Sequence, residues 1–128
     1  MAADNFRKLA AYKKAFALAM EIFHISKRFP KEERYSLTDQ IRRSSRSVCS
    51  CVGEAYRKKE YEGYFVNKIT DADAENTETR VWLDFARGCS YITDNEWNDL
   101  EVKAEEVGRL LNHMEKNPEK YIHKKDRK

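Results

Sequence analysis

Four segments of this chain carry apolar or small residues at alternating steps of three and four positions. Steps of three and four return to the same side of an α-helix, so each segment is predicted to be an amphipathic helix with one seam facing a core. The seam of the first segment consists of Leu9, Tyr12, Phe16, Ala19, Phe23 and Ser26. The seam of the last segment consists of Trp97, Leu100, Ala104, Val107, Leu111 and Met114.

The two middle segments follow the same rule. The second has the seam Leu37, Ile41, Ser44, Ser45, Val48, Val52 and Ala55. The third has the seam Tyr61, Phe65, Ile69, Ala72, Asn76, Thr79, Leu83 and Ala86. Small residues dominate the second seam, so we expect this helix to lie close to its neighbours.

Start and stop signals give the expected helix boundaries. The first helix runs from Phe6 to Arg28 and ends before Pro30, because the residue before a proline resists the helical conformation. The second begins after Ser36, which resembles a capping box with Asp39 three residues on. The third covers 61–87 and stops at Gly88. The fourth begins at a clearer capping box, Thr93 with Glu96, and ends before Pro118.

These observations predict an all-α fold, an antiparallel up-down-up-down four-helix bundle. Sustained 3–4 spacing is typical of helices that pack about 20° from parallel. We expect a single domain over 1–128, in which a basic tail, 116–128, is partly disordered. No apolar run has the length of a membrane span and the N-terminus has no signal-peptide core, so we expect a cytoplasmic protein without membrane contact.

The first helix has more apolar surface than one bundle face requires. A second stripe at helical spacing lies beside its seam and consists of Ala11, Leu18, Ile22, Ile25 and Phe29. On the third helix, Tyr64, Trp82 and Phe85 flank the seam in the same way. Either the core is broad or the surplus forms a subunit interface.

Charge is distributed unevenly along the chain. Residues 1–59 carry a net charge of +8, residues 60–115 carry −9, and the tail 116–128 carries +4. If the basic half of one copy faces the acidic half of the next, the contact is head-to-tail and closes into a ring. We therefore expect a homo-oligomer, more readily a ring-shaped assembly than a two-fold dimer.

A catalytic or metal site is not expected. Bundle di-iron sites use Glu-x-x-His pairs that point inward, but the one match, Glu21 with His24, falls nearly opposite the first seam. An acidic stripe on the third helix, Asp71, Glu75 and Glu78, is predicted to pair with arginines of the second helix within or between subunits; Arg42 is the candidate partner of Glu75 or Glu78. Acid–base catalysis by this stripe is a remote alternative, so we expect a non-enzyme without cofactors or metal.

The second helix carries a basic stripe opposite its apolar seam. Arg43, Arg46 and Arg57 lie on this stripe, and Lys58 and Lys59 follow at its end. Guanidinium groups bind phosphate oxygens in a fork, so the stripe predicts sequence-independent binding to the RNA or DNA backbone. The alternative is a protein–protein interaction module in which the opposite charges serve self-assembly and a protein partner.

Two stretches of the chain resemble a known family. The run from Gln40 to Val48 and the run from Val52 to Arg57 are similar to the four-helix-bundle proteins encoded in 23S ribosomal RNA intervening sequences. The third helix matches that family at Phe65, Glu75, Glu78, Thr79, Trp82, Leu83 and Ala86. The chain departs from the family at Cys51, where an Asn is usual, and at Ala72-Asp73, where a Gly-Ser is common.

The resemblance implies a bundle that assembles as a homopentameric ring. Similar proteins are accessory factors of the reverse transcriptases of diversity-generating retroelements, where a basic surface of the ring binds nucleic acid. The partners implied are therefore further copies of the chain, RNA or DNA, and either a reverse transcriptase or ribosomal RNA.

Overall fold

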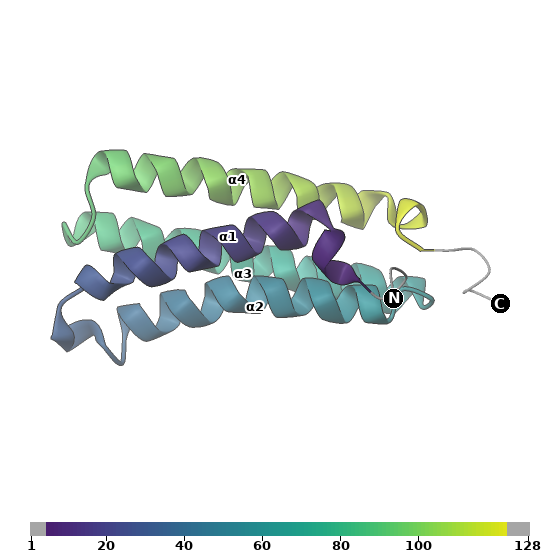
Figure 1. Cartoon of the computed structure of the whole chain (residues 1–128), viewed down its shortest axis with the longest axis horizontal. Helices are drawn as coiled ribbons and strands as arrows, with labels where there is room; N and C mark the ends of the chain where they lie inside the picture. Colours follow the sequence, from purple (N-terminus) through teal and green to yellow (C-terminus); the bar gives the residue numbers. More distant parts are fainter. Residues whose placement is uncertain (1–4, 123–128) are drawn as a thin grey trace.

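The computed structural model describes residues 5–122, and these form a four-helix bundle. The helices are α1 (Ala10–Ile25), α2 (Leu37–Arg57), α3 (Glu62–Gly88) and α4 (Asp94–Lys116). Consecutive helices run in opposite directions (Figure 1), which confirms the predicted up-down-up-down fold. The described residues include no β-strand.

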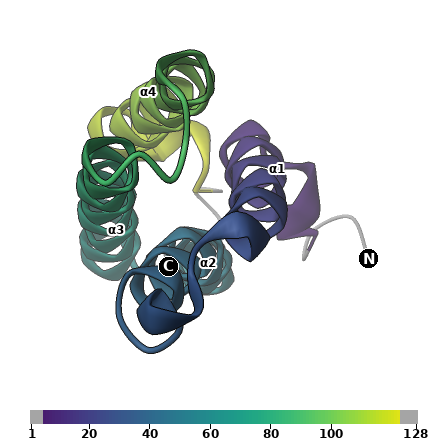
Figure 2. The same cartoon turned by 90° about the vertical axis from the view of Figure 1, so that its left-hand side faces the viewer.

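The four helices occupy the corners of a square when the bundle is seen along its axis (Figure 2). Helix α2 packs against α1 and α3, and α4 packs against α3 and α1. Helices α1 and α3 therefore lie on opposite corners and expose their outer sides in different directions.

The predicted seams of α2, α3 and α4 form most of the core. Every seam residue of α2 is buried, and so is every seam residue of α3 except Tyr61, which is 58% exposed. In α4 all but the half-buried Trp97 are buried. The 3–4 pattern located the interior of these three helices correctly, and the apolar residues that flank the seam of α3, such as Tyr64 and Phe85, are exposed.

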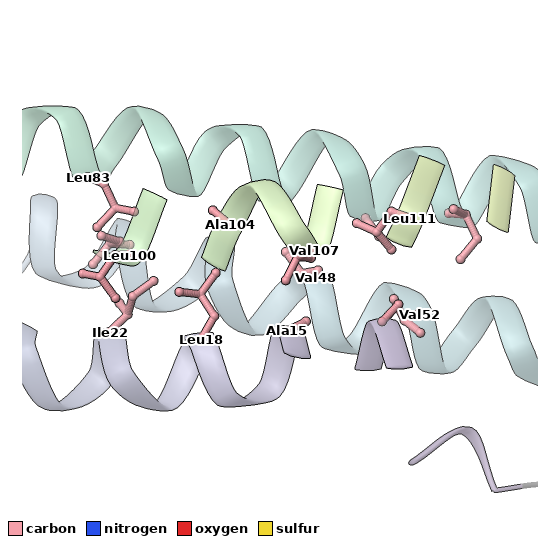
Figure 3. Packing of buried hydrophobic residues seen from close by; sticks show 14 of the residues in the cluster. Ala15, Leu18, Ile22, Val48, Val52, Leu83, Leu100, Ala104, Val107 and Leu111 are labelled. Atoms are coloured by element: carbon pink, nitrogen blue, oxygen red, sulfur yellow. The ribbon is translucent and has the colours of Figure 1, made fainter. Parts of the chain in front are cut away.

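The predicted seam of α1 is wrong in part. The helix buries Ala11, Ala15, Leu18 and Ile22, whereas Phe16 of the predicted seam is 51% exposed. The side chains of Ala15, Leu18 and Ile22 point towards the other helices (Figure 3). Ala19 and Ser26 of the predicted seam are also buried, but Leu9, Tyr12 and Phe23 are only half-buried. Both stripes of α1 have the helical period. The stripe with smaller, aliphatic side chains is buried, because it allows α1 to lie close to its neighbours, and much of the aromatic stripe remains at the surface.

Short 3₁₀ turns flank α1, so the single helix expected over 6–28 is divided. Phe6–Lys8 forms η2, and Ser26–Arg28 forms η3 at the other end. The aromatic ring of Phe6 folds back onto α2 and lies against Gly53, where a Cβ would meet the ring at 3.6 Å. The edge of the Phe6 ring also meets Tyr12, with the two ring centres 5.0 Å apart.

Two of the three predicted cap signals differ from the structure. The side chain of Ser36 does not cap α2; its hydroxyl donates to Glu33, whose Oε1 also accepts from the backbone N–H of Leu37. At the end of α3, Gly88 is the last helical residue, and the left-handed position falls two residues later on Ser90 (φ 63°). The capping box of Thr93 and Glu96 is confirmed.

The chain after α4 continues along the bundle. Pro118–Lys120 forms the 3₁₀ turn η5, Tyr121 stacks on Phe65, and Ile122 is 3% exposed. The last residues of the predicted basic tail, 123–128, lie outside the described residues. Within 5–122, none of the helices combines the length and the hydropathy that a transmembrane segment requires.

Candidate nucleic-acid interface

The basic stripe of α2 lies in a shallow basin, which we call the arginine basin. The basin has a volume of about 580 Å³. Its lining consists of Arg34, Thr38, Asp39, Arg42, Arg43, Arg46, Ser47 and Ser50. Four guanidinium groups, three hydroxyls and one carboxylate are thus gathered on one surface. The guanidinium groups and the hydroxyls are donors that phosphate oxygens accept from.

Arg42 is the least exposed of the four arginines and is held by the end of α1. Its Nε donates to Ser26 Oγ at 2.8 Å, and its guanidinium lies 4.8 Å from the centre of the Phe23 ring. A terminal nitrogen also reaches the carbonyl of Phe23 at 3.4 Å. Arg42 therefore joins α2 to α1, and no carboxylate within 5–122 pairs with it, contrary to the predicted pairing with Glu75 or Glu78.

Arg43 is the arginine that faces the acidic stripe of α3. Its guanidinium forms an ion pair with Glu78 and lies 3.6 Å from Glu75 Oε1. Glu78 also accepts a hydrogen bond from Trp82 Nε1 at 3.1 Å. Arg42 and Arg43 are successive residues and point about 100° apart on the helix, so the rotation of α2 in the bundle decides which of them meets α3.

The third acidic residue of the stripe is separate. Asp71 lies 3.9 Å from Lys68 Nζ, which pairs more closely with Glu54 of α2 at 2.8 Å. The three carboxylates are thus distributed over two ion-pair groups, one around Arg43 and one around Lys68. Glu75 and Glu78 both face the guanidinium of Arg43, and Asp71 faces Lys68.

Arg46 points outward at the edge of the basin. It is exposed, and its guanidinium lies 5.7 Å from the centre of the Phe23 ring. Arg34, in the segment before α2, lies over Tyr35 at 5.8 Å and was not predicted as a site residue. The sequence offered no periodic signal for Arg34 because it lies outside the helix; only the fold brings it beside Arg46.

The remaining predicted basic residues lie at the C-terminal end of α2. Arg57 is about 21 Å along the helix axis from Arg43, given a rise of about 1.5 Å per residue. Lys58 lies near the rings of Tyr61 and Tyr64, and Lys59 lies 4.6 Å from the centre of the Tyr56 ring. Cations at this position are also favoured by the negative end of the helix dipole.

A larger hollow, the α1–α2 groove, adjoins the basin. It has a volume of about 770 Å³. Its apolar lining consists of Phe6, Tyr12, Phe16, Ala19, Met20 and Tyr56. Arg46 and Ser50 line both the groove and the basin, so the basic and the aromatic surfaces are continuous. Three of these residues, Tyr12, Phe16 and Ala19, were assigned by sequence to the first seam, because the aromatic stripe was expected to be interior.

Metal ligands do not gather in the described part of the chain. No group of three His, Cys, Asp or Glu side chains there is suited to a metal ion. Glu21, the acidic half of the Glu-x-x-His match, instead accepts a hydrogen bond from Lys103 of α4 at 2.7 Å.

Comparison with known proteins shows a family and a similar solved structure. Residues 7–113 match the family model described as 23S rRNA-intervening sequence protein. The fold is similar to a 1.70 Å crystal structure from Bacteroides thetaiotaomicron VPI-5482, a protein of unknown function from the S23 ribosomal protein family. The two chains are 26% identical, with a TM-score of 0.76 over 89% of this chain and 98% of the other. No curated protein sequence matches significantly.

Proposed function

Since the chain belongs to the 23S rRNA-intervening sequence protein family, we propose that it is a non-enzymatic scaffold that assembles with copies of itself and binds the RNA or DNA backbone. The arginine basin is the binding surface in this proposal. The assembly is a ring of identical chains, for which the family resemblance suggests five. The family name makes ribosomal RNA, or a transcript that contains it, the first nucleic acid to test.

The observation that carries the proposal is the position of Arg46. Its guanidinium is exposed between Arg42 and Arg43 on one side and the α1–α2 groove on the other, with the hydroxyls of Ser47 and Ser50 beside it. Ion pairs and hydrogen bonds to α3 and α1 hold Arg43 and Arg42 in place, so the basin is preorganised around Arg46. A preorganised cationic surface binds phosphate at a lower entropic cost than flexible lysines.

Self-assembly supports this function because an assembly carries several copies of a basin that binds phosphate weakly by itself. One basin offers few phosphate contacts, and several on one rim act together through a high effective concentration. The opposite net charges of the two halves of the chain favour contacts between identical copies.

The test is the salt dependence of binding to a fluorescent single-stranded or double-stranded oligonucleotide, measured by anisotropy. We expect measurable binding at about 50 mM salt, and a slope of log K against log salt that falls by about 0.7–0.9 for each phosphate contact removed. The variant Arg34→Ala/Arg46→Ala is expected to lose such contacts. Arg109→Ala, an exposed arginine of α4, is the matched control and is expected to change nothing.

The competing function is a protein–protein interaction module. No binding of either RNA or DNA at about 50 mM salt contradicts the proposed nucleic-acid role and favours that module. Equal effects of Arg109→Ala and Arg34→Ala/Arg46→Ala contradict the assignment of the basin as the binding surface.

A further inference from the structure

The aromatic ring of Phe23, on the last turn of α1, is surrounded by cations. The Nζ atom of Lys27 lies 4.8 Å from the centre of this ring. The guanidinium carbons of Arg42 and Arg46 lie 4.8 and 5.7 Å from the same point. The three charges come from different elements, because Lys27 belongs to η3 and the two arginines belong to α2. We call these four residues, Phe23, Lys27, Arg42 and Arg46, the Phe23 cluster.

The positive charges of the Phe23 cluster are not neutralised by carboxylates. Among residues 5–122, none of its three cations forms an ion pair. Asp39, which lines the arginine basin, forms no ion pair in that range either. Two further carboxylates at this end of the bundle have other partners. Glu96 accepts hydrogen bonds from Arg28, and Glu33 accepts one from Tyr91.

Hydrogen-bond donors accompany these charges. Arg42 uses its Nε for Ser26 and one terminal nitrogen for the carbonyl of Phe23. Its other terminal nitrogen has no acceptor in the described part of the chain, and the side chains of Lys27 and Arg46 donate to no atom there. Phosphate oxygens accept from such donors, from arginine in a fork and from lysine as a point charge.

The Phe23 ring accounts for the proximity of three like charges. The face of an aromatic ring attracts cations, which offsets part of their mutual repulsion. The ring is half-buried and belongs to a helix, so it holds the ends of three long side chains near one fixed point. An anion that binds beside it relieves the remaining repulsion and requires little further ordering of these side chains.

From these contacts we propose that the Phe23 cluster is a phosphate-binding site of the nucleic-acid surface, in which Lys27 contacts phosphate and Phe23 is a positioning residue. The inference rests on the proposed function. It extends the binding surface from the arginine basin on α2 to the end of α1, the helix that packs beside α2 (Figure 2). Since all three cations lie within 5.7 Å of one point, a short stretch of nucleic-acid backbone can contact all of them.

The test is the salt dependence of oligonucleotide binding by Lys27→Ala, measured by fluorescence anisotropy. Loss of one phosphate contact is expected to weaken binding several-fold at about 50 mM salt and to lower the slope of log K against log salt by about 0.7–0.9. Lys27→Arg keeps the charge and is expected to retain the native slope. Lys120→Ala, a substitution of an exposed lysine in η5, is the matched control and is expected to bind like the native protein.

Phe23→Leu tests the positioning role, because it removes the ring and keeps all three charges. This variant is expected to bind several-fold more weakly at about 50 mM salt with a nearly unchanged slope, since its cations are ordered only when the nucleic acid binds. Phe85→Leu is the control: it removes a 56% exposed ring of α3 that contacts no cation among residues 5–122, and it is expected to keep native binding. Circular dichroism and urea unfolding establish that each variant is folded.

The outcomes distinguish a failure of this site from a failure of the proposed function. A native protein that binds neither RNA nor DNA contradicts both. If Arg34→Ala/Arg46→Ala weakens binding and Lys27→Ala does not, the arginine basin remains the binding surface and the Phe23 cluster is not a phosphate site. Native affinity in a destabilised Phe23→Leu means that the ring has only a structural role. An equal loss of affinity in Phe85→Leu also contradicts the positioning role of Phe23.

Discussion

The hydroxyl groups of Ser44 on α2 and Thr79 on α3 lie 2.8 Å apart in the interior, where neither side chain reaches solvent. Each hydroxyl also has a carbonyl acceptor in its own helix: Thr79 reaches that of Glu75 at 2.9 Å and Ser44 that of Ile41 at 3.4 Å, so either hydroxyl can donate to the other. This hydrogen bond joins two seam positions of α2 and α3 at which apolar side chains would otherwise be expected. It allows two polar residues to occupy seam positions without an unsatisfied group.

A double-mutant cycle measures this bond. Ser44→Ala and Thr79→Val are each expected to lower the free energy of unfolding by about 1 kcal/mol, and the pair together by less than the sum, with a coupling of about 0.5–1.5 kcal/mol. Urea unfolding followed by circular dichroism gives these values. Ser50→Ala, whose exposed hydroxyl donates only within α2, is expected to be nearly neutral. Strict additivity of Ser44→Ala and Thr79→Val means that the bond contributes nothing.

Acid sensitivity is expected at the start of α4. Glu96 accepts two hydrogen bonds from Arg28 and one from the backbone N–H of Thr93, and these hold the pKa of its carboxyl at about 2, below its usual 4.5. A lowered pKa in the folded state gives a stabilisation that is complete above pH 4.5 and is lost as the pH falls towards 2. Glu96→Gln is expected to cost about 1 kcal/mol at pH 7 and to flatten the fall in stability between pH 5 and 2.

Thermal unfolding over that pH range checks the prediction. Glu32→Gln, a substitution of an exposed carboxylate in η4 (Lys31–Glu33), is the control and is expected to keep the native pH profile. Glu33 has a lowered pKa because Ser36, Tyr91 and the backbone of Leu37 donate to it, so some acid sensitivity is expected to remain in Glu96→Gln. A profile for Glu96→Gln that overlays the native one contradicts the role of Glu96.

The end of α3 is open to stabilisation. Ser90 has a left-handed backbone conformation. The backbone N–H of Tyr91 donates to the carbonyl of Ala86, and the backbone N–H of Ser90 donates to the carbonyl of Arg87. Glycine is the preferred residue at the left-handed position of this pattern. Ser90→Gly is therefore expected to raise the free energy of unfolding by about 0.5–1 kcal/mol. Gly88→Ala is the informative partner, because a Cβ at this helical position meets nothing within 4 Å and is expected to stabilise as well. A loss of stability in Gly88→Ala means instead that the end of α3 requires glycine at position 88.

The two stripes of α1 are distinguished by their effect on folding. Leu18→Ala removes a side chain that is 3% exposed and is expected to cost about 2–5 kcal/mol. Phe16→Ala removes one that is 51% exposed and is expected to cost less than about 1 kcal/mol in the single chain. Urea unfolding is measured at concentrations at which light scattering shows single chains, so that assembly does not contribute. Equal losses in the two variants contradict the assignment of the aromatic stripe to the surface.

Sequence spacing predicted most of the fold and a part of the candidate site. The interior faces of α2, α3 and α4 followed from their continuous 3–4 seams, and the Thr93–Glu96 cap followed from residue types three apart. The cap of α2 did not, because the carboxylate that closes it, Glu33, comes from the preceding turn. Ion pairs of Glu75 and Glu78 with an arginine of the second helix were predicted, but the partner is Arg43 rather than Arg42, since one residue turns the side chain by about 100°. Binding to nucleic acid by Arg43, Arg46, Arg57, Lys58 and Lys59 stays a prediction.

What the sequence alone determined is the number of helices, their approximate ends and the opposite charges of the two halves, because these depend on residue types at short range along the chain. What only the tertiary structure decided is which stripe of α1 is interior and which side chains meet across helices. Both stripes of α1 have the same period, and only the space between α2 and α4 selects Leu18 and Ile22 over Phe16. That choice leaves an aromatic groove on the surface beside Arg46.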